Sequence, residues 1–134
     1  MIGLRAALSG VLLWAGHGPS FGAEAGDAVR GERGFQRCYA CHSVDPAETA
    51  RLQGPSLHGV LGRPAAAVSG FEYSDAMRGR SKAGLTWTVE WLDAFLANPE
   101  AVVPGTTMSA LPIADPVERA DIIAYLGSLG NQGR

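Results

Sequence analysis

The sequence has few cysteines, histidines and lysines. Two cysteines and three histidines occur in 134 residues. A structural zinc site needs four ligands, and only His17 and His58 supplement the histidine beside the second cysteine, so zinc is poorly supported. Lysine occurs once, at Lys82, and the net charge is −2. This balance argues against nucleic acid as a partner, and it leaves no polybasic segment for an anionic membrane surface.

Strand-like alternation of apolar and polar residues is also missing, and no internal repeat is visible. Apolar residues make up 46% and charged residues 18% of the chain, as in an ordinary folded domain. Eighteen glycines and eight prolines indicate many turns. Because a small chain rich in turns has a limited core of its own, a large flat apolar cofactor would supply much of what it packs against.

The N-terminal segment has the pattern of an export signal. Arg5 precedes an apolar run over residues 6–15, and small residues follow at 22–25. We predict a signal peptide over residues 1–23, with cleavage after Ala23 or Ala25, and one domain over residues 24–134. The alternative is an uncleaved anchor, although the apolar run is short for a membrane span. Export predicts a periplasmic protein that is not integrated in the membrane once the signal is removed.

The stretch Cys38-Tyr39-Ala40-Cys41-His42 carries the most specific chemistry. A C-x-x-C-H run predicts covalent attachment of haem, with Cys38 and Cys41 as thioethers and His42 on the iron. A disulfide and a thioredoxin-like redox pair are the alternatives for this cysteine spacing. The second needs a strand before the motif and a helix after it, and the sequence predicts neither. Since bacteria attach haem to reduced cysteines outside the cytoplasm, the export signal supports the haem interpretation.

Capping residues and apolar spacing predict at least three helices. The first begins after Asp27 and delivers Cys38 at its C-terminal end. A short helix begins near Ser74, ahead of a polar run over residues 78–84. A third follows Thr88 and stops before Pro99, and its expected apolar face consists of Val89, Leu92, Phe95 and Leu96.

The last predicted helix has the clearest start. Asp115 is an N-cap, Pro116 occupies the first helical position, and Glu118 is expected to close a capping box. Glycines at 127 and 130 are expected to end it. Its expected apolar stripe consists of Val117, Ala120, Ile123, Ala124 and Leu126.

Two loops offer groups that suit a haem iron. Met108, in the loop over residues 102–112, could close the second axial position opposite His42. Met77 competes with Met108, and an open or histidine-filled position is the remaining alternative. In the turn-rich loop over residues 43–63, the Pro55 carbonyl is the candidate acceptor for the second ring N–H of His42.

The ordered motifs make the chain similar to the class I c-type cytochromes, the monohaem family of mitochondrial cytochrome c and its bacterial periplasmic relatives. The matching blocks are spread over nearly all of the mature chain. They are Gly26-Asp27, Gly31, Phe35, Cys38 with Cys41-His42, Gly54-Pro55-Ser56-Leu57-His58-Gly59, Gly62-Arg63, Gly70-Phe71-Glu72-Tyr73-Ser74-Asp75-Ala76, Leu85-Thr86-Trp87, Asn98-Pro99, Pro104-Gly105-Thr106-Thr107-Met108 and Glu118-Arg119-Ala120-Asp121-Ile122-Ile123-Ala124-Tyr125-Leu126.

This resemblance implies an all-α fold of three or more helices and long loops wrapped around one covalently bound haem c. Cys38 and Cys41 would hold the haem, and His42 and Met108 would be the axial ligands. It implies that Arg63, Tyr73 and Trp87 are donors around the haem propionates. It further implies that Thr106 caps the same buried region, that the Pro55 carbonyl orients His42, and that Gly31 lets the first helix cross the last beside Tyr125.

With both axial positions filled, the implied function is one-electron transfer in a periplasmic respiratory or photosynthetic chain, not enzymatic turnover of a small-molecule substrate. Donor and acceptor proteins would dock transiently at the haem edge. The alternatives are a dedicated cytochrome subunit of a periplasmic dehydrogenase, and a catalytic or sensory haem protein with an open iron site.

The chain departs from the family pattern at several positions. Phe95, Met77 and Ala110 stand where mitochondrial relatives have a tyrosine, an asparagine and a shielding phenylalanine. Glu100-Ala101 replace two lysines of the family's docking face. The ring of lysines that steers mitochondrial cytochrome c to acidic partners is therefore missing.

Overall fold

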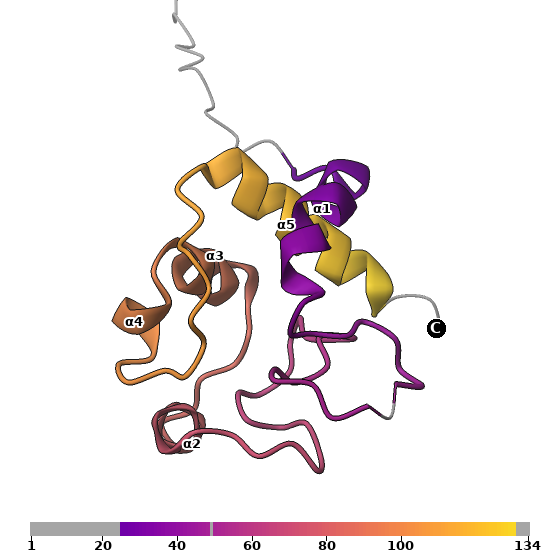
Figure 1. The fold of residues 1–134 in the computed structure, drawn as a ribbon. Coiled ribbons are helices and arrows are strands. Elements are labelled where there is room, and N and C mark those ends of the chain that lie inside the picture. The colour runs from indigo at the N-terminus through magenta and orange to yellow at the C-terminus, as the bar shows by residue number, and fades with distance from the viewer. Residues whose placement is uncertain (1–24, 49, 131–134) are drawn as a thin grey trace, which may run out of the picture.

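The computed structural model describes residues 25–48 and 50–130, and the predicted signal peptide over residues 1–23 lies outside this part (Figure 1). The helices are α1 (Ala28–Phe35), the 3-10 helix η1 (Gln36–Cys38), α2 (Asp75–Lys82), α3 (Val89–Ala97), α4 (Pro99–Val102) and α5 (Pro116–Leu129). In the described ranges no strand forms, and the one isolated bridge is antiparallel, between Pro64 and Thr86. The predicted all-α class is confirmed.

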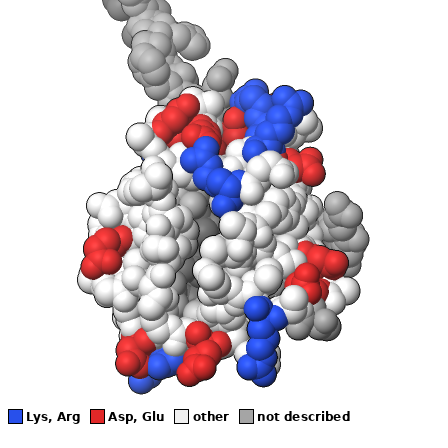
Figure 2. All heavy atoms as spheres, in the orientation of Figure 1, with Lys and Arg blue, Asp and Glu red and all other residues white. Residues whose placement is uncertain are grey.

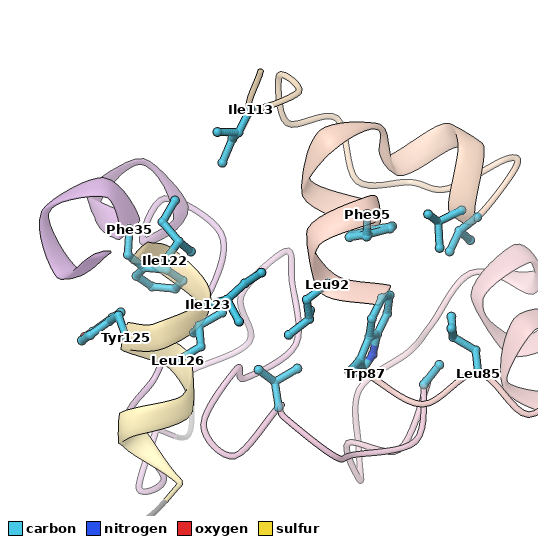
Figure 3. Close-up of a cluster of buried hydrophobic side chains, with 14 residues drawn as sticks. Phe35, Leu85, Trp87, Leu92, Phe95, Ile113, Ile122, Ile123, Tyr125 and Leu126 are labelled. Atoms are coloured by element: carbon cyan, nitrogen blue, oxygen red, sulfur yellow. The ribbon is translucent and has the colours of Figure 1, made fainter. Parts of the chain in front are cut away.

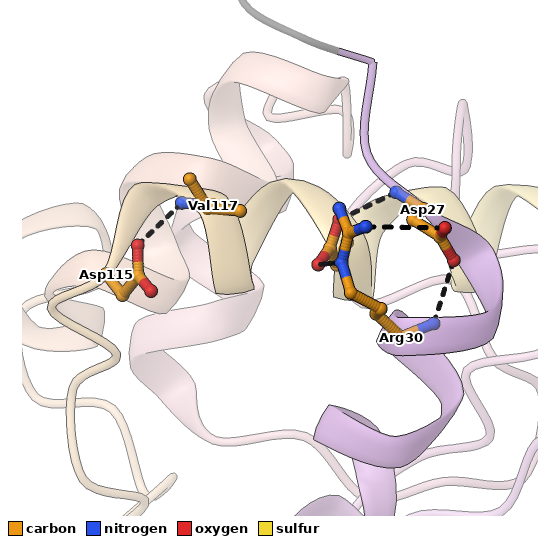
Figure 4. Close-up of polar contacts among 5 residues, drawn as sticks. Asp27, Arg30, Asp115 and Val117 are labelled. Carbon is orange, nitrogen blue, oxygen red and sulfur yellow. Dashed lines mark hydrogen bonds and ion pairs between the residues drawn. The ribbon is translucent and has the colours of Figure 1, made fainter.

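Four predicted helix starts are confirmed by side-chain caps. Each cap accepts a hydrogen bond from a backbone N–H in the first turn, where no helical acceptor exists. The N–H groups of Arg30, Met77, Trp91 and Val117 donate over 2.9, 3.2, 3.2 and 2.9 Å respectively. The accepting caps are Asp27, Ser74, Thr88 and Asp115. Figure 4 shows the Asp27 and Asp115 caps.

Two helical segments differ from the sequence prediction. α2 runs on through the polar segment to Lys82, because Arg78, Arg80 and Lys82 are good helix formers, and Arg78 and Lys82 are exposed. α4 was not predicted, although Asn98 caps it by accepting from the Ala101 N–H at 3.2 Å.

The predicted features of the last helix also need correction. α5 continues through Gly127 and ends at Gly130. A Cβ on Gly127 would meet Leu61 Cδ1 at 2.8 Å, so this glycine serves close packing and not termination. The expected capping box is wrong, because the Glu118 carboxylate pairs instead with the Arg37 guanidinium.

α1 and α5 cross at very short range, and they form one side of the molecule (Figure 1). Gly31 makes this crossing possible, since a Cβ there would lie 1.9 Å from the Asp121 carbonyl oxygen and 2.9 Å from Tyr125 Cβ. The expected crossing beside Tyr125 is present. Next to it the Phe35 ring packs on Tyr39 and Tyr125 at centroid distances of 4.9 and 5.5 Å, and the two tyrosine hydroxyls lie 2.8 Å apart.

A buried carboxylate also stabilises the crossing of α1 and α5. Asp121 is 5% exposed and accepts from the Asp27 backbone N–H at 2.6 Å and from Arg30 Nε at 2.7 Å (Figure 4). The Arg30 hydrogen bonds, followed by the Asp27 N–H, hold the pKa of Asp121 below its usual value against the opposing effect of burial. The cap of α1 and the middle of α5 are therefore one polar unit.

The buried core has two connected parts (Figure 3). Phe35, Ile122 and Tyr125 lie where α1 and α5 meet. Trp87, just before α3, packs on Phe95 of α3 with the ring centroids 5.1 Å apart. Two residues that the sequence placed on apolar faces are exposed instead: Val89 by 52% and Val117 by 57%. Both stand in the first turn of a helix, where the side chain projects past the core.

α2 lies apart from the other helices (Figure 1). Its backbone packs against no other helix in the described part of the chain, and its side-chain link to α3 is the Arg80 guanidinium, 5.6 Å above the Trp91 ring. The space-filling view shows a deep opening in the middle of one face, bordered by uncharged residues, with charged side chains nearer the rim (Figure 2). None of the described helices combines the length and apolarity needed to cross a membrane.

Candidate haem site

The cysteine motif begins where the N-terminal helical segment ends. Cys38 is the last residue of η1, and its carbonyl accepts from the backbone N–H groups of Cys41 and His42 at 3.1 and 2.9 Å. This tight turn places Cys41 and His42 directly after the helix. Both thiols are half-buried and free, so the disulfide alternative is absent from the structure. Burial raises the pKa of the Cys38 thiol, opposed by the Arg37 charge, so the unreacted sulfur is a thiol at neutral pH.

The His42 imidazole is held from the turn-rich loop. Its Nδ1 atom lies 2.7 Å from the Pro55 carbonyl oxygen, the acceptor that the sequence singled out. An N–H on Nδ1 donates to this carbonyl, which leaves Nε2 as the unprotonated nitrogen that can bind a metal. Burial lowers the pKa of His42 more than the Pro55 hydrogen bond raises it, so the ring is neutral at neutral pH.

Gly54 permits this geometry, and its role was missed at the sequence level, where it was assigned only to a turn. A Cβ on Gly54 would lie 2.3 Å from Cε1, 2.6 Å from Nδ1 and 2.7 Å from Nε2 of His42. The Gly54 N–H donates to the Cys41 carbonyl at 2.8 Å, which fixes the loop against the motif. The signal available in the sequence was a glycine directly before the proline whose carbonyl serves a ligand.

A second group of predicted site residues lies in another part of the interior. It consists of Arg63, Tyr73 and Trp87. The Arg63 guanidinium donates to the His58 and Ser56 carbonyls at 3.0 and 2.8 Å. The Tyr73 hydroxyl accepts from the Val68 N–H at 3.1 Å. Burial lowers the pKa of Arg63, opposed by Tyr73, and burial raises the pKa of Tyr73, opposed by that hydrogen bond and by Arg63. The arginine and the phenol are thus electrostatic neighbours.

Trp87 and the backbone ladder next to it join this group to the core. Trp87 is 7% exposed, and its backbone N–H donates to the Arg63 carbonyl at 3.0 Å. The Gly62 N–H donates in return to the Trp87 carbonyl at 2.9 Å. These reciprocal bonds hold the Arg63 side of the loop against the start of α3.

Met108 lies in the loop between α4 and α5, half-buried against the core. Its backbone N–H donates to Thr106 Oγ1 at 3.2 Å, so Thr106 shapes the turn that presents the methionine. The other half-buried thioether, Met77 of α2, packs against the same core cluster. The described part of the chain therefore brings both candidate sulfur ligands to the interior.

These residues fit a haem. The motif supplies two free thiols and a neutral imidazole with one nitrogen held by Pro55, and the interior supplies thioethers without hydrogen-bonding demands. The backbone of α2 contacts no other helix in the described part of the chain. A porphyrin would give its half-buried Met77 side chain a further surface to pack on.

Comparison with known proteins identifies the family. The chain is 44% identical over 108 residues to a cytochrome c2 of Rhodomicrobium vannielii, spanning 81% of this chain and 83% of that protein. The chain belongs to the class I monohaem cytochrome c family. A cytochrome c2 of Blastochloris viridis is 37% identical over 111 residues, which cover 83% and 84% of the two chains. No family model matches the sequence.

Solved structures support the same family assignment. The cytochrome c2 from Rhodospirillum centenum superposes with a TM-score of 0.72 at 36% identity, covering 78% of this chain and 98% of that one. Cytochrome cH from Methylobacterium extorquens gives 0.69 at 42% identity, covering 77% and 99%. This cytochrome is accordingly an electron carrier and not an enzyme, it has a covalently bound haem c, and it exchanges electrons with redox partners.

Proposed function

We propose that this cytochrome is a periplasmic one-electron carrier of a respiratory or photosynthetic chain, exported by residues 1–23. Cys38 and Cys41 hold the haem c through thioethers, and His42 and Met108 are the axial ligands. When bound, the haem supplies exchange of one electron between its ferric and ferrous states. The observation that supports this most is the His42 Nδ1 to Pro55 oxygen pair at 2.7 Å, which fixes the imidazole plane.

The remaining residues tune that exchange. A methionine ligand and a dry apolar interior both favour the ferrous state, because burial disfavours the extra positive charge of ferric iron. Arg63, Tyr73 and Trp87 are placed to neutralise and hydrogen-bond the propionates, which keeps two acidic groups tolerable inside the protein. Ligands held by backbone carbonyls and tight turns move little between the two states.

Replacing Met108 with histidine tests the second ligand. We expect Met108→His to remain six-coordinate, lose the weak red absorption band of ferric iron bound to a thioether, and show a markedly lower midpoint potential, because methionine raises the potential relative to histidine. The matched control is Thr107→His, which puts the same side chain one residue earlier at an exposed position. An unchanged band and potential in Met108→His, together with loss of the band in Met77→Leu, would show that Met108 does not bind the iron.

The docking surface we propose for redox partners is uncharged. Residues 101–114, which run from α4 through the Met108 loop, carry no charged side chain. Leu111 is 85% exposed on this segment. In the space-filling view uncharged residues border the central opening (Figure 2). Such a surface suits partners that bind through apolar contact, with little long-range steering.

Salt dependence tests this surface. We expect the second-order rate constants for oxidation by hexacyanoferrate(III) and reduction by hexaammineruthenium(II) to change by less than about threefold between low and high ionic strength, because no strong local field acts on either ion. At low ionic strength, Leu111→Lys should raise the rate constant for the hexacyanoferrate anion and lower the rate constant for the hexaammineruthenium cation. Added salt should remove both effects. Steep and opposite salt dependences in the unmodified protein would contradict an uncharged surface.

A further inference from the structure

Met77 is the largest apolar side chain of α2. Apart from Ala76, the other residues of this helix are charged, small or polar, and Met77 itself packs half-buried against the core. In the described part, the backbone of α2 contacts no other helix. The packing of α2 on the core therefore comes from its side chains, Met77 among them.

The loop that carries Met108 passes over the same helix. A Cβ on Gly105 would lie 3.6 Å from Ala76 Cβ, in ordinary contact, so the turn three residues before Met108 rests on the residue next to Met77. Gly105 has a φ of +83°, which fixes the turn at this point. Both methionines also pack against one core cluster. The two thioethers therefore approach the interior from adjoining segments.

We propose that Met77 is a reserve axial ligand, whose thioether takes the iron position when Met108 is lost. This inference rests on the proposed function, in which Met108 normally holds that position. Methionine is suited to the exchange, because its unbranched chain has three rotatable bonds and its neutral sulfur needs no proton transfer to bind. α2 is also free to adjust, since few helix contacts have to break when it shifts.

Three variants of the haem-loaded protein test the proposal: Met108→Ala, Met77→Leu and the double variant. We expect Met108→Ala to keep the red band of ferric iron bound to a thioether, and the double variant to lose it. In the ferrous protein labelled with methyl-13C methionine, the strongly upfield methyl signal should belong to Met77 in Met108→Ala. Met77→Leu keeps the apolar volume and should leave the band of the parent protein intact.

Loss of the band in Met108→Ala with the band kept in Met77→Leu would overturn the reserve role while leaving Met108 as the ligand. A band that persists in the double variant would also overturn it, because another donor would then be responsible. Loss of the band in Met77→Leu alone would refute both the reserve role and the assignment of Met108. If Met108→Ala yields too little protein, Met108→Val leaves the same position without a sulfur and is interpreted in the same way.

Discussion

Gly54→Ala is expected to lower the free energy of unfolding by roughly 3 kcal/mol, at the upper end of the usual cost of overpacking. The new methyl group would lie 2.3 Å from His42 Cε1. Neither side can retreat, because the Gly54 N–H is bonded to the Cys41 carbonyl and the imidazole to the Pro55 carbonyl. We therefore also expect weakened binding of His42 to the iron, seen as a mixture of spin states in the ferric spectrum. Urea unfolding and absorption spectroscopy measure the two effects.

Gly79→Ala is the matched control for this change. Gly79 lies inside α2, and a Cβ there meets nothing within 4 Å. The same substitution should raise the free energy of unfolding by about 0.5–1 kcal/mol, because alanine favours the helix over glycine. Equal effects at both positions would contradict a steric role for Gly54 beside the ligand.

Gly31→Ala is expected to lower the free energy of unfolding by about 3 kcal/mol or more, because it disturbs the close contact between α1 and the backbone of α5. Its Cβ would lie 1.9 Å from the Asp121 carbonyl oxygen, which belongs to the backbone of α5 and cannot rotate away. Moving α1 outward would also strain the hydrogen bonds that Asp121 accepts from Asp27 and Arg30. The urea midpoint should fall, while the covalent haem content of the purified protein should not change.

Gly34→Ala is the comparison variant for Gly31→Ala. It lies one turn further along α1, where a Cβ would meet side-chain atoms and no backbone, the nearest being Ile122 atoms at 3.1 and 3.3 Å. Since a side chain can shift by a few tenths of an ångström, we expect a cost of about 1 kcal/mol or less. A larger loss at Gly34 than at Gly31 would show that the backbone contact is not the limiting one.

Local signals predicted the helix starts well, because a cap is a bond between a side chain and backbone atoms two or three residues away. Asp27, Ser74, Thr88 and Asp115 each cap the helix that the sequence predicted. The helix ends were less predictable. α5 passes through Gly127 because that glycine receives Leu61 from a distant loop, which no local pattern records.

Contacts in the interior were predictable only where a sequence motif implies the partner group. The pairing of His42 with Pro55 followed from the need of a metal-binding imidazole for an acceptor, and it is present at 2.7 Å. The burial of Asp121 had no such signal, because its partners Asp27 and Arg30 lie more than ninety residues away. Glu118 was assigned to a local cap, whereas its carboxylate pairs with the guanidinium of Arg37, which lies far away in the sequence.

The crossing of α1 and α5 also sets an order of events for an exported chain. Hydrogen bonds join residues 94 positions apart, so a polypeptide that leaves a translocation pore N-terminus first presents Cys38 and Cys41 well before α5 emerges. During that interval Phe35 has no Tyr125 to pack on, and Asp27 has no Asp121 to bind. Under the proposed export, Cys38 and Cys41 would thus be open to haem attachment before α5 packs against α1.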